Sequence, residues 1–450
     1  IKARFTDFES AQQARKQKKK QVSYLNKLTT LIRSPLNPIE RNKTVALITM
    51  EIHNRDVMEK MIKQNCSSTN DFEWLSQLRF IFIKEGAEFG KCDCKQTNST
   101  LEYSYEYQGN NGRLVVTPLT DRCVLTLITA MYLNRGGNPL GPAGTGKTET
   151  VKDLGKNLAK YVVVMNCSDG MDYKSVGRIF SGLVQSGSWG CFDEFNRIKI
   201  EVISVVAMQI SDILNALTQK VSSFYFMGQN ISCNLNCGIF ITMNPGYQGR
   251  QELPENLKAL FRGVTMMVPD REIIIRVLLC AVGYDEFVML SKKFTVLYQL
   301  SEEQLSKQRH YDFGLRNILS VLRTAGKTKR DNRQADESEL LYQTLRDMNM
   351  SKMVAQDVPL FLSLLKDLFP KLSAPAVAVY KDVEDQVNIA VENAGLIKHK
   401  NWLKKVVQLY ETVLVRHGIM VIGPTGGGKT EIFTRLRMAL AEVYKRQYRD

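Results

Sequence analysis

Two glycine-rich phosphate-binding motifs, each ending in Lys-Thr, occur in this chain of 450 residues. Both match the pattern G-x-x-x-x-G-K-[ST], at Gly141–Thr148 and at Gly423–Thr430. In this motif the glycines let backbone N–H groups turn toward phosphate oxygens. The lysine reaches the β- and γ-phosphates, and the threonine hydroxyl ligates Mg²⁺. The separation suits one whole nucleotide-binding module and a connection to the next, so the sequence predicts a tandem NTPase.

We expect both motifs to bind ATP or ADP with Mg²⁺. The residues predicted to contact the nucleotide are Gly141, Pro142, Ala143, Gly144, Thr145, Gly146, Lys147, Thr148 and Glu149 in the first motif, and Gly423, Pro424, Thr425, Gly426, Gly427, Gly428, Lys429 and Thr430 in the second. Because the second motif stands close to the end of the sequence, we expect the rest of its module to lie outside this chain.

The composition is that of an ordinary soluble globular protein, with 44% hydrophobic and 24% charged residues. No uninterrupted apolar run reaches the roughly 18 residues that span a bilayer, and the polar, basic N-terminus does not resemble a signal peptide. We therefore expect no membrane contact. The nine cysteines are scattered and lack a paired zinc-ligand spacing, which favours reduced cytosolic thiols over a metal site.

The net charge of +15 is concentrated near the N-terminus, where Arg15–Lys20 contains five basic residues. Such a segment could contact nucleic acid or tubulin. A solvated helix face or a flexible arm explains it equally simply, and we favour that interpretation.

Four apolar runs predict the strands of a buried parallel sheet, because strands covered on both faces are apolar throughout. The runs are Tyr161–Asn166, Trp189–Asp193, Gly238–Asn244 and Val264–Val268. Predicted helices alternate with them, at Asp121–Leu133, Thr148–Tyr161 and Ile198–Leu217. This alternation predicts an α/β fold with a doubly wound parallel sheet, and residues 218–236 are expected to form a hairpin insertion.

The segments on either side of this sheet are predicted to be mainly helical. Residues 1–100 are expected to be helices interrupted by loops at Cys66–Asn70 and Lys91–Thr100. Residues 270–323 suit a helical lid, Lys327–Glu339 is expected to be an exposed loop, and residues 340–420 are expected to be helical again.

An acidic pair, Asp193-Glu194, closes the second of the four predicted strands. An acid at a strand tip beside a phosphate loop can hold Mg²⁺, and the next acid can polarise the attacking water. We therefore predict Thr148 and Asp193 as Mg²⁺ ligands and Glu194 as the residue that activates water. The alternative is an acidic pair on the surface without a catalytic role.

Three further residues are predicted to serve the same site. Asn244, at the tip of the next strand, can hold the attacking water. Arg316, in the helical lid, can contact the γ-phosphate. Arg262, before the last predicted strand, stands where ring ATPases place an arginine that acts on the neighbouring module. A turn asparagine and two surface arginines are the alternative interpretations.

These motifs, in this order, resemble the AAA+ ring ATPases and, more narrowly, the dynein heavy chains. The segments that carry the resemblance are Pro118–Cys123, Gly141–Thr150, Asn166–Gly170, Cys191–Ile198, Ile241–Arg250, Leu253–Lys258 and Gln408–Thr412. Within the family, His310–Thr324 and Leu345–Asn349 are similar to axonemal outer-arm heavy chains, in particular the γ type.

The resemblance implies that the chain has three parts. Residues 1–105 correspond to the end of the linker, a mostly helical element, and residues 351–450 to the start of the second module. Residues 106–350 correspond to the first AAA+ module, with a large α/β subdomain to about residue 270 and a helical lid after it. It also implies that Val116, Pro118 and Leu119 contact the adenine ring. The sequence departs from the family at Arg135, Asn138 and Leu140, which are larger or more polar than expected, and at Gly263, which replaces a proline.

The activity that the resemblance implies is ATP hydrolysis that drives linker movement in a microtubule motor of cilia and flagella. Microtubules, bound through parts absent from this chain, and other dynein heavy, intermediate and light chains are the expected partners, within the cytoplasm, cytoskeleton and axoneme. Because the arginine that completes the first site is expected from the second module, we expect the isolated segment to be weakly active. The alternatives are an AAA+ nucleic-acid translocase and a regulatory module that binds nucleotide without hydrolysis. We expect no nucleic-acid partner, since no stripe of interleaved aromatic and basic residues is present.

Overall fold

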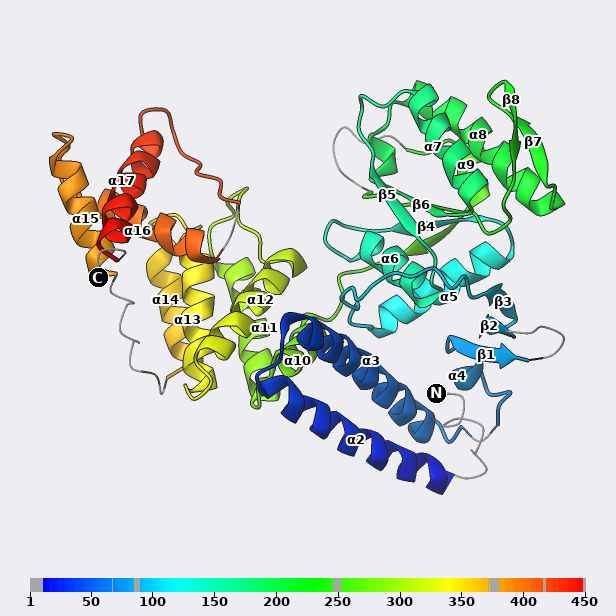
Figure 1. Ribbon diagram of the computed structural model, residues 1–450, viewed down its shortest axis with the longest axis horizontal. Coiled ribbons are helices and arrows are strands. Elements are labelled where there is room, and N and C mark those ends of the chain that lie inside the picture. Colours follow the sequence, from blue (N-terminus) through cyan, green and yellow to red (C-terminus); the bar gives the residue numbers. More distant parts are fainter. Residues whose placement is uncertain are drawn as a thin grey trace. The chain divides into compact units, whose positions relative to one another are not determined.

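The computed structural model describes residues 11–66, 68–84, 90–245, 252–370, 372, 380–415 and 418–447. The chain divides into two compact units, residues 1–282 and 283–450 (Figure 1). Each unit has its own hydrophobic core. The last part of the family-like segment Ile241–Arg250, from residue 246 on, lies outside the described residues.

The centre of the first unit is a five-stranded parallel sheet with the strand order β10-β4-β9-β6-β5. The strands are β4 (Gly136–Leu140), β5 (Val162–Asn166), β6 (Trp189–Asp193), β9 (Gly238–Ile241) and β10 (Phe261–Thr265). The predicted doubly wound parallel sheet is therefore confirmed. Since all strands run the same way, the loops that follow β4, β6 and β9 meet at one edge of the sheet, where such folds bind ligands.

The last strand begins earlier than predicted. The prediction placed it at Val264–Val268, but β10 starts at Phe261 because Phe261–Thr265 pairs in register with Gly136–Leu140 of β4. Arg262 therefore lies inside the strand and not before it.

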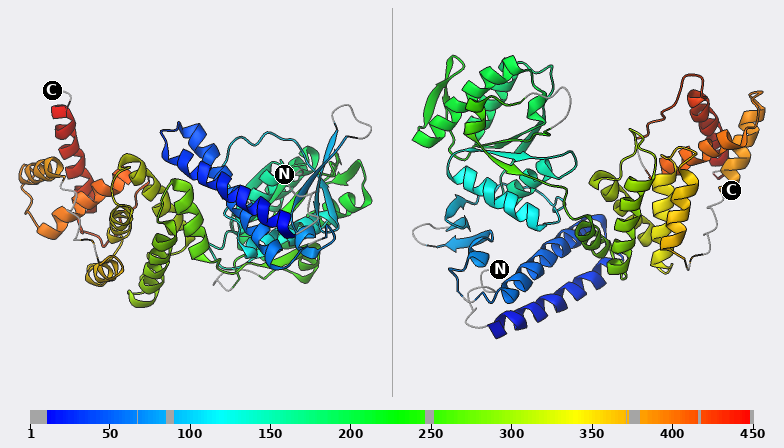
Figure 2. Two further views of the ribbon diagram at one scale, coloured as in Figure 1. Left: turned by 90° about the horizontal axis from the view of Figure 1, so that it is seen from below. Right: turned by 180° about the vertical axis from the view of Figure 1, so that it is seen from behind.

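Helices cover both faces of the sheet, as Figure 1 and Figure 2 show. On one face, α5 (Pro118–Tyr132) and α6 (Lys147–Asn157) pack against Cys191 and Phe240. On the other, α7 (Tyr173–Ser186), α8 (Ile200–Gln219) and α9 (Glu255–Leu260) pack against Phe192 and Ile241. Neighbouring strand residues thus enter opposite clusters, as the alternation of side chains along a strand requires. A short 3-10 helix (Phe195–Arg197) follows β6, and the predicted hairpin is formed by β7 (Ser223–Phe226) and β8 (Gln229–Ser232).

Among the described residues, α8 is the helix that is long and apolar enough to cross a membrane. Half of its most apolar window is nevertheless buried, and its buried side chains include Val206, Ile210 and Ile213 of the sheet-covering cluster. Glu201 and Asp212 interrupt its apolar run. This burial is that of a core helix in an α/β layer.

The first hundred residues contain more strand than predicted. After α2 (Ala11–Arg33), α3 (Pro38–Lys63) and α4 (Phe72–Leu75), the strands β1 (Arg79–Ile83), β2 (Lys91–Gln96) and β3 (Ser99–Glu102) form an antiparallel sheet. The prediction of a loop at Lys91–Thr100 is therefore wrong. The side chains on one face of β2 are polar, so the sequence of this strand is not apolar throughout. On its other face the buried Cys94 belongs to the same core cluster as Leu127 of α5. Helix α10 (Arg271–Val282) packs against α3 and α2.

The second unit is helical: α11 (Phe287–Gln304), α12 (Leu315–Asp331), α13 (Glu337–Met350), α14 (Val358–Leu368), α15 (Lys381–Glu392), α16 (Lys400–Val415) and α17 (Lys429–Gln447). The predicted exposed loop at Lys327–Glu339 is wrong, because α12 runs to Asp331 and α13 begins at Glu337. An ion pair of 2.9 Å between Lys329 Nζ and a Glu337 carboxylate oxygen joins the two helices, and both side chains are largely buried. The high charge of this segment therefore stabilises a helical hairpin.

Candidate active site

The first phosphate loop connects β4 to α6 and has the backbone conformation that its glycines permit. Gly141, Gly144 and Gly146 have φ angles of 155°, 77° and 85°, in the region that side chains disfavour. At Gly141 space is also limiting, since a Cβ would lie 2.1 Å from the carbonyl oxygen of Met266. Gly146 is the N-cap of α6, so the open N–H groups at the start of this helix adjoin the loop, as anion binding requires.

Lys147 is the first residue of α6, and its side chain points toward the phosphate loop. Its side chain is 6% exposed, and its Nζ donates hydrogen bonds to the carbonyl oxygens of Gly141 (2.9 Å) and Pro142 (2.6 Å). The ammonium group is therefore held within the loop that is predicted to enclose the phosphates.

Thr148 and Asp193, the two predicted Mg²⁺ ligands, are in contact. Thr148 Oγ1 donates to Asp193 Oδ1 at 2.8 Å, although the residues come from α6 and from the end of β6. A hydroxyl and a carboxylate oxygen are ligands that Mg²⁺ prefers, so this pair fits the predicted ion. The structure brings the two side chains together, and their role as Mg²⁺ ligands stays a prediction.

Thr242, which the sequence interpretation did not identify, links the two acids. Its hydroxyl donates to Asp193 Oδ1 and accepts the backbone N–H of Glu194 at 3.1 Å. Thr242 directly follows β9, and its side chain is fully buried. One buried hydroxyl therefore fixes the carboxylate of one acid and the backbone of the next.

Glu194 leaves the sheet in a left-handed conformation, with φ of 54°. Its Oε1 accepts a hydrogen bond of 3.1 Å from Asn244 Nδ2, and its Oε2 forms an ion pair of 2.7 Å with Arg197. Asn244 is 4% exposed, whereas the Glu194 side chain is 29% exposed. The structure thus brings together the predicted water-activating acid and the predicted asparagine, and adds Arg197 as a partner that the sequence interpretation missed.

The acidic pair also affects a thiol on the neighbouring strand. The backbone N–H of Cys167, just after β5, donates to the carbonyl oxygen of Asp193 at 2.9 Å. Burial of the Cys167 side chain, together with the negative charges of Asp193 and Glu194, raises the pKa of its thiol to about 12. This thiol is therefore neutral at physiological pH and is not a nucleophile for the site.

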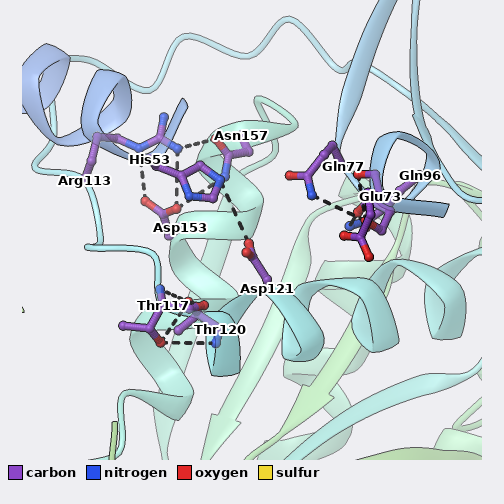
Figure 3. Close-up of polar contacts among 11 residues, drawn as sticks. His53, Glu73, Gln77, Gln96, Arg113, Thr117, Thr120, Asp121, Asp153 and Asn157 are labelled. Carbon is purple, nitrogen blue, oxygen red and sulfur yellow. Dashed lines mark hydrogen bonds and ion pairs between the residues drawn. The ribbon is translucent and has the colours of Figure 1, made fainter. Parts of the chain in front are cut away.

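The predicted adenine-contacting segment is attached to α6 through Asp153 (Figure 3). Asp153 Oδ1 lies 3.1 Å from Arg113 Nε and accepts the backbone N–H of Leu114 at 3.2 Å. The same guanidinium donates to Asn157, one turn further along α6. Val116 follows this anchor, and Pro118 begins α5 behind the N-cap Thr117. Residues 113 and 114, just before the predicted adenine contacts, are therefore fixed to the helix that carries Lys147 and Thr148.

The positions that depart from the family are neighbours in space. Asn138 of β4 and Gly263 of β10 are register partners, and a Cβ on Gly263 would lie 3.4 Å from Leu140 Cδ1. A side chain at position 263 would therefore contact Leu140. Asn138, Leu140 and Gly263 all lie in the sheet, and Leu140 directly precedes Gly141 of the phosphate loop.

The two predicted arginines occupy different places. Arg262 is exposed on β10, the edge strand next to β4, so it is separated from Asp193 on β6 by two strands. Arg316 is exposed in the first turn of α12, in the second unit.

The second phosphate loop shares with the first the left-handed backbone at its last two equivalent glycines. Gly426 and Gly428 have φ angles of 81° and 72°, and α17 begins at Lys429 just as α6 begins at Lys147. Lys429 Nζ donates to the carbonyl oxygens of Gly423 (2.9 Å) and Pro424 (2.7 Å). The second loop is more exposed within its unit than the first, whose lysine is buried.

Comparison with known proteins identifies a family for most of the chain. Residues 103–430 match the family described as the hydrolytic ATP-binding site of the dynein motor region. The chain is 52% identical to the Dynein-1-beta heavy chain of the flagellar inner arm I1 complex of Chlamydomonas reinhardtii, over 96% of this chain and 10% of that protein. It is 54% identical to the Dynein gamma chain of the flagellar outer arm of the same organism, over 92% of this chain and 9% of that protein.

A human relative gives a similar result: Dynein axonemal heavy chain 2 of Homo sapiens is 52% identical, over 95% of this chain and 10% of that protein. The expected similarity to an outer-arm γ chain is confirmed, and an inner-arm chain is similar at nearly the same identity. The chain spans about a tenth of the length of these relatives.

Proposed function

The chain belongs to the family of the dynein motor region with its hydrolytic ATP-binding site, and on this premise we propose that residues 106–350 form the first AAA+ module and hydrolyse ATP. The observation that carries the proposal is the continuous set of contacts from the phosphate loop to the acids. It runs from Thr148 through Asp193 and Thr242 to Glu194 and Asn244. A phosphate loop alone supplies only nucleotide binding, whereas hydrolysis also needs a residue that orients or activates the attacking water.

In the proposed reaction, the loop N–H groups and Lys147 bind the β- and γ-phosphates. Thr148 and Asp193 would hold Mg²⁺, which supplies positive charge to the phosphate oxygens when it is bound. Asn244 orients the attacking water and Glu194 accepts its proton as the water oxygen bonds to the γ-phosphorus. The bond from that phosphorus to the β,γ-bridging oxygen breaks, so that ADP and phosphate are the products. Phosphoryl transfer depends mainly on such placement of charge, and these residues are fixed by β6, β9 and α6.

The wider function that we propose is that of a microtubule motor of the axoneme. In this assignment residues 1–105 are the end of the linker and residues 351–450 begin the second module. The packing of the β1–β3 sheet on α5 supports it, because this contact joins the first segment directly to the ATP-binding module. Linker movement, microtubules and other dynein heavy, intermediate and light chains as partners, and an axonemal location belong to this proposal.

Glu194→Gln in the complete heavy chain tests the hydrolytic assignment. The amide keeps an oxygen that can accept from Asn244 but is a much weaker proton acceptor than a carboxylate. We expect kcat to fall by roughly 10²- to 10⁴-fold while ATP binding stays within a few-fold. Glu201→Gln, at an exposed position in the first turn of α8, is the matched control.

Unchanged turnover in Glu194→Gln would favour the regulatory module that does not hydrolyse ATP. Stimulation of the wild-type ATPase by DNA or RNA, with none by microtubules, would favour the nucleic-acid translocase. We also propose that the 450-residue segment alone hydrolyses ATP far more slowly than the complete motor, since a neighbouring module supplies the arginine for the first site. Equal rates for segment and motor would contradict that point.

A further inference from the structure

A buried asparagine, Asn196, stands two residues after the predicted water-activating acid Glu194. It belongs to the short 3-10 helix Phe195–Arg197 that follows β6, and it is 4% exposed. The side chains of Glu194 and Arg197 are 29% and 52% exposed, so this turn directs its charged side chains outward and one amide into the interior. A buried amide is unfavourable unless it forms hydrogen bonds, so its contacts show which of its groups is used.

The amide of Asn196 holds the backbone of the predicted water-orienting residue. Asn196 Nδ2 donates to the carbonyl oxygen of Asn244 at 3.2 Å, in a contact between two buried residues. The reverse orientation of the amide would place its oxygen against that carbonyl oxygen, where two acceptors repel. The contact therefore fixes Nδ2 toward Asn244.

The backbone at Asn244 is held by side chains because the regular sheet has ended before it. Strand β9 ends at Ile241, and Met243 forms an isolated bridge with Leu140. The residue after Asn244 is Pro245, which has no N–H to donate. Asn244 thus lies beyond the ladder of hydrogen bonds between strands, and the hydrogen bond from Asn196 fixes its carbonyl group.

The contacts of Asn196, Asn244 and Glu194 form a closed ring. Asn196 holds the carbonyl oxygen of Asn244, and Asn244 Nδ2 donates to Glu194 Oε1 at 3.1 Å. Glu194 and Asn196 belong to the same turn, which therefore holds both the main chain and the side chain of Asn244. A displacement of Asn244 breaks one or both of these contacts. The ring thus keeps the amide in one direction, as orientation of an attacking water requires.

The oxygen of the Asn196 amide distinguishes this residue from an ordinary core residue. Its Oδ1 is buried, and no group in the described parts of the chain donates a hydrogen bond to it. A buried acceptor without a donor is destabilising, and such an atom calls for a functional explanation or a bound water. The amide therefore serves this position through its donor Nδ2 and not through a fully satisfied buried network.

We propose that Asn196 is a positioning residue for ATP hydrolysis. By holding the Asn244 carbonyl, it keeps the Asn244 amide aimed at the attacking water beside Glu194. The inference rests on the proposed roles of Glu194 and Asn244, and it adds a residue that acts through Asn244. Within the described parts of the chain, Asn196 makes no hydrogen bond to the phosphate loop, so its loss acts on the hydrolytic step and leaves nucleotide binding unchanged.

A comparison of turnover with nucleotide affinity tests the inference. Turnover is measured in the complete heavy chain, and affinity in the 450-residue chain carrying Lys429→Ala, so that binding reports the first loop. Asn196→Leu keeps a side chain of similar size and removes the donor. We expect kcat to fall roughly 10-fold or more, with the affinities for ADP and for a non-hydrolysable ATP analogue changed by less than about 2-fold. Asn215→Leu, at an exposed position on α8, is the matched control and should change neither quantity.

A double variant separates positioning from a general structural role. If Asn196 acts through Asn244, Asn196→Leu lowers kcat by less than about 2-fold in a chain that already carries Asn244→Ala. Asn196→Asp, whose ionised carboxylate also cannot donate, repeats the test if Asn196→Leu does not fold.

Three results would overturn the inference and leave the proposed function intact. They are an unchanged kcat in the Asn196 variants, a loss of nucleotide affinity as large as the loss of kcat, and losses of kcat that multiply in the double variant. If Asn244→Ala itself leaves kcat unchanged, the role of Asn244 fails and the inference fails with it. An unchanged kcat in Glu194→Gln contradicts the proposed function instead.

Discussion

The ion pair between Arg113 and Asp153 provides the sharpest stability prediction, through Asp153→Ala. The Asp153 carboxylate accepts hydrogen bonds from Arg113 Nε at 3.1 Å and from the backbone N–H of Leu114 at 3.2 Å (Figure 3). The Asp153 side chain is 9% exposed. Removing it leaves a guanidinium with 19% exposure without its charged partner. It also releases the segment that leads to Val116, one of the predicted adenine contacts.

The magnitude follows from this burial. Breaking a buried pair by removing one partner costs about 3–5 kcal/mol, and the partial exposure of Arg113 places the expected loss near the lower end, at about 3 kcal/mol. For a folding unit of this size, such a loss lowers Tm by roughly 6–12 °C. Asp153→Asn should lose less, because its amide oxygen can still accept the N–H of Leu114.

Chemical denaturation of the chain measures these losses, and α6 offers a matched control. Lys152 and Glu149 form an ion pair of 2.6 Å on the surface of the same helix, with side chains 37% and 58% exposed. Lys152→Ala should therefore change the free energy of unfolding by at most about 1 kcal/mol. A loss in Asp153→Ala no larger than in Lys152→Ala would refute the argument that burial of the Arg113 pair stabilises this unit.

Three further predictions concern the first site. Gly141→Ala should abolish nucleotide binding and lower Tm, because its Cβ would lie 2.1 Å from the Met266 carbonyl oxygen; wild-type nucleotide affinity would contradict the loop geometry. Thr242→Val should lower kcat by roughly 10-fold or more at similar ATP affinity, since its hydroxyl holds Asp193 and the N–H of Glu194; an unchanged kcat would remove Thr242 from the site. Burial raises the pKa of the Cys167 thiol from about 9 to about 12, so its stabilising contribution is complete below pH 9 and is lost as the pH rises toward 12. Alkylation of Cys167 in the folded chain, followed at that residue, should therefore stay slow up to about pH 9. Rapid modification of Cys167 at pH 8 would show that its thiol is accessible.

Strands β5, β6 and β9 were predictable because they are apolar runs, whereas β4, with the sequence Gly-Gly-Asn-Pro-Leu, gives no such signal. Trp189–Asp193 was predicted with its observed bounds, and the acid at its end was predicted to stand beside the phosphate loop, where Thr148 contacts it. The less apolar elements were not predictable in this way. Strand β2 contains Lys91 and Asp93, and its one deeply buried thiol, Cys94, does not form a periodic signal.

The charged helical hairpin of the second unit was missed for a related reason. The segment containing Lys329 and Glu337 lacks the large apolar residues that mark a helix in sequence. Its order depends on a partner 2.9 Å away and on the backbone N–H groups of Asp285 and Glu286, both of which donate to Glu337. The contacts of Glu337 with Asp285 and Glu286 join residues about 50 positions apart, so they leave no pattern in the local sequence.

In the candidate site, too, some residues could be predicted from the sequence and others could not. The acids and the asparagine could be found because each stands at the tip of an apolar run. Thr242 could not be distinguished from an ordinary strand threonine, and Arg197 could not be distinguished from a surface arginine. Their roles depend on distances between separate strands and turns, of 3.1 Å to the Glu194 N–H and 2.7 Å to its carboxylate.

The unequal roles of the two phosphate loops are the central claim, and turnover of the complete heavy chain with one lysine removed at a time tests it most directly. Lys147 belongs to the loop that contacts the acidic pair through Thr148, whereas Lys429 belongs to a loop with similar backbone geometry in the other unit. Lys147→Ala should lower ATP turnover by roughly 10²-fold or more, and Lys429→Ala should retain most of it. Loss of turnover in Lys429→Ala with retention in Lys147→Ala would contradict the assignment of hydrolysis to the first site.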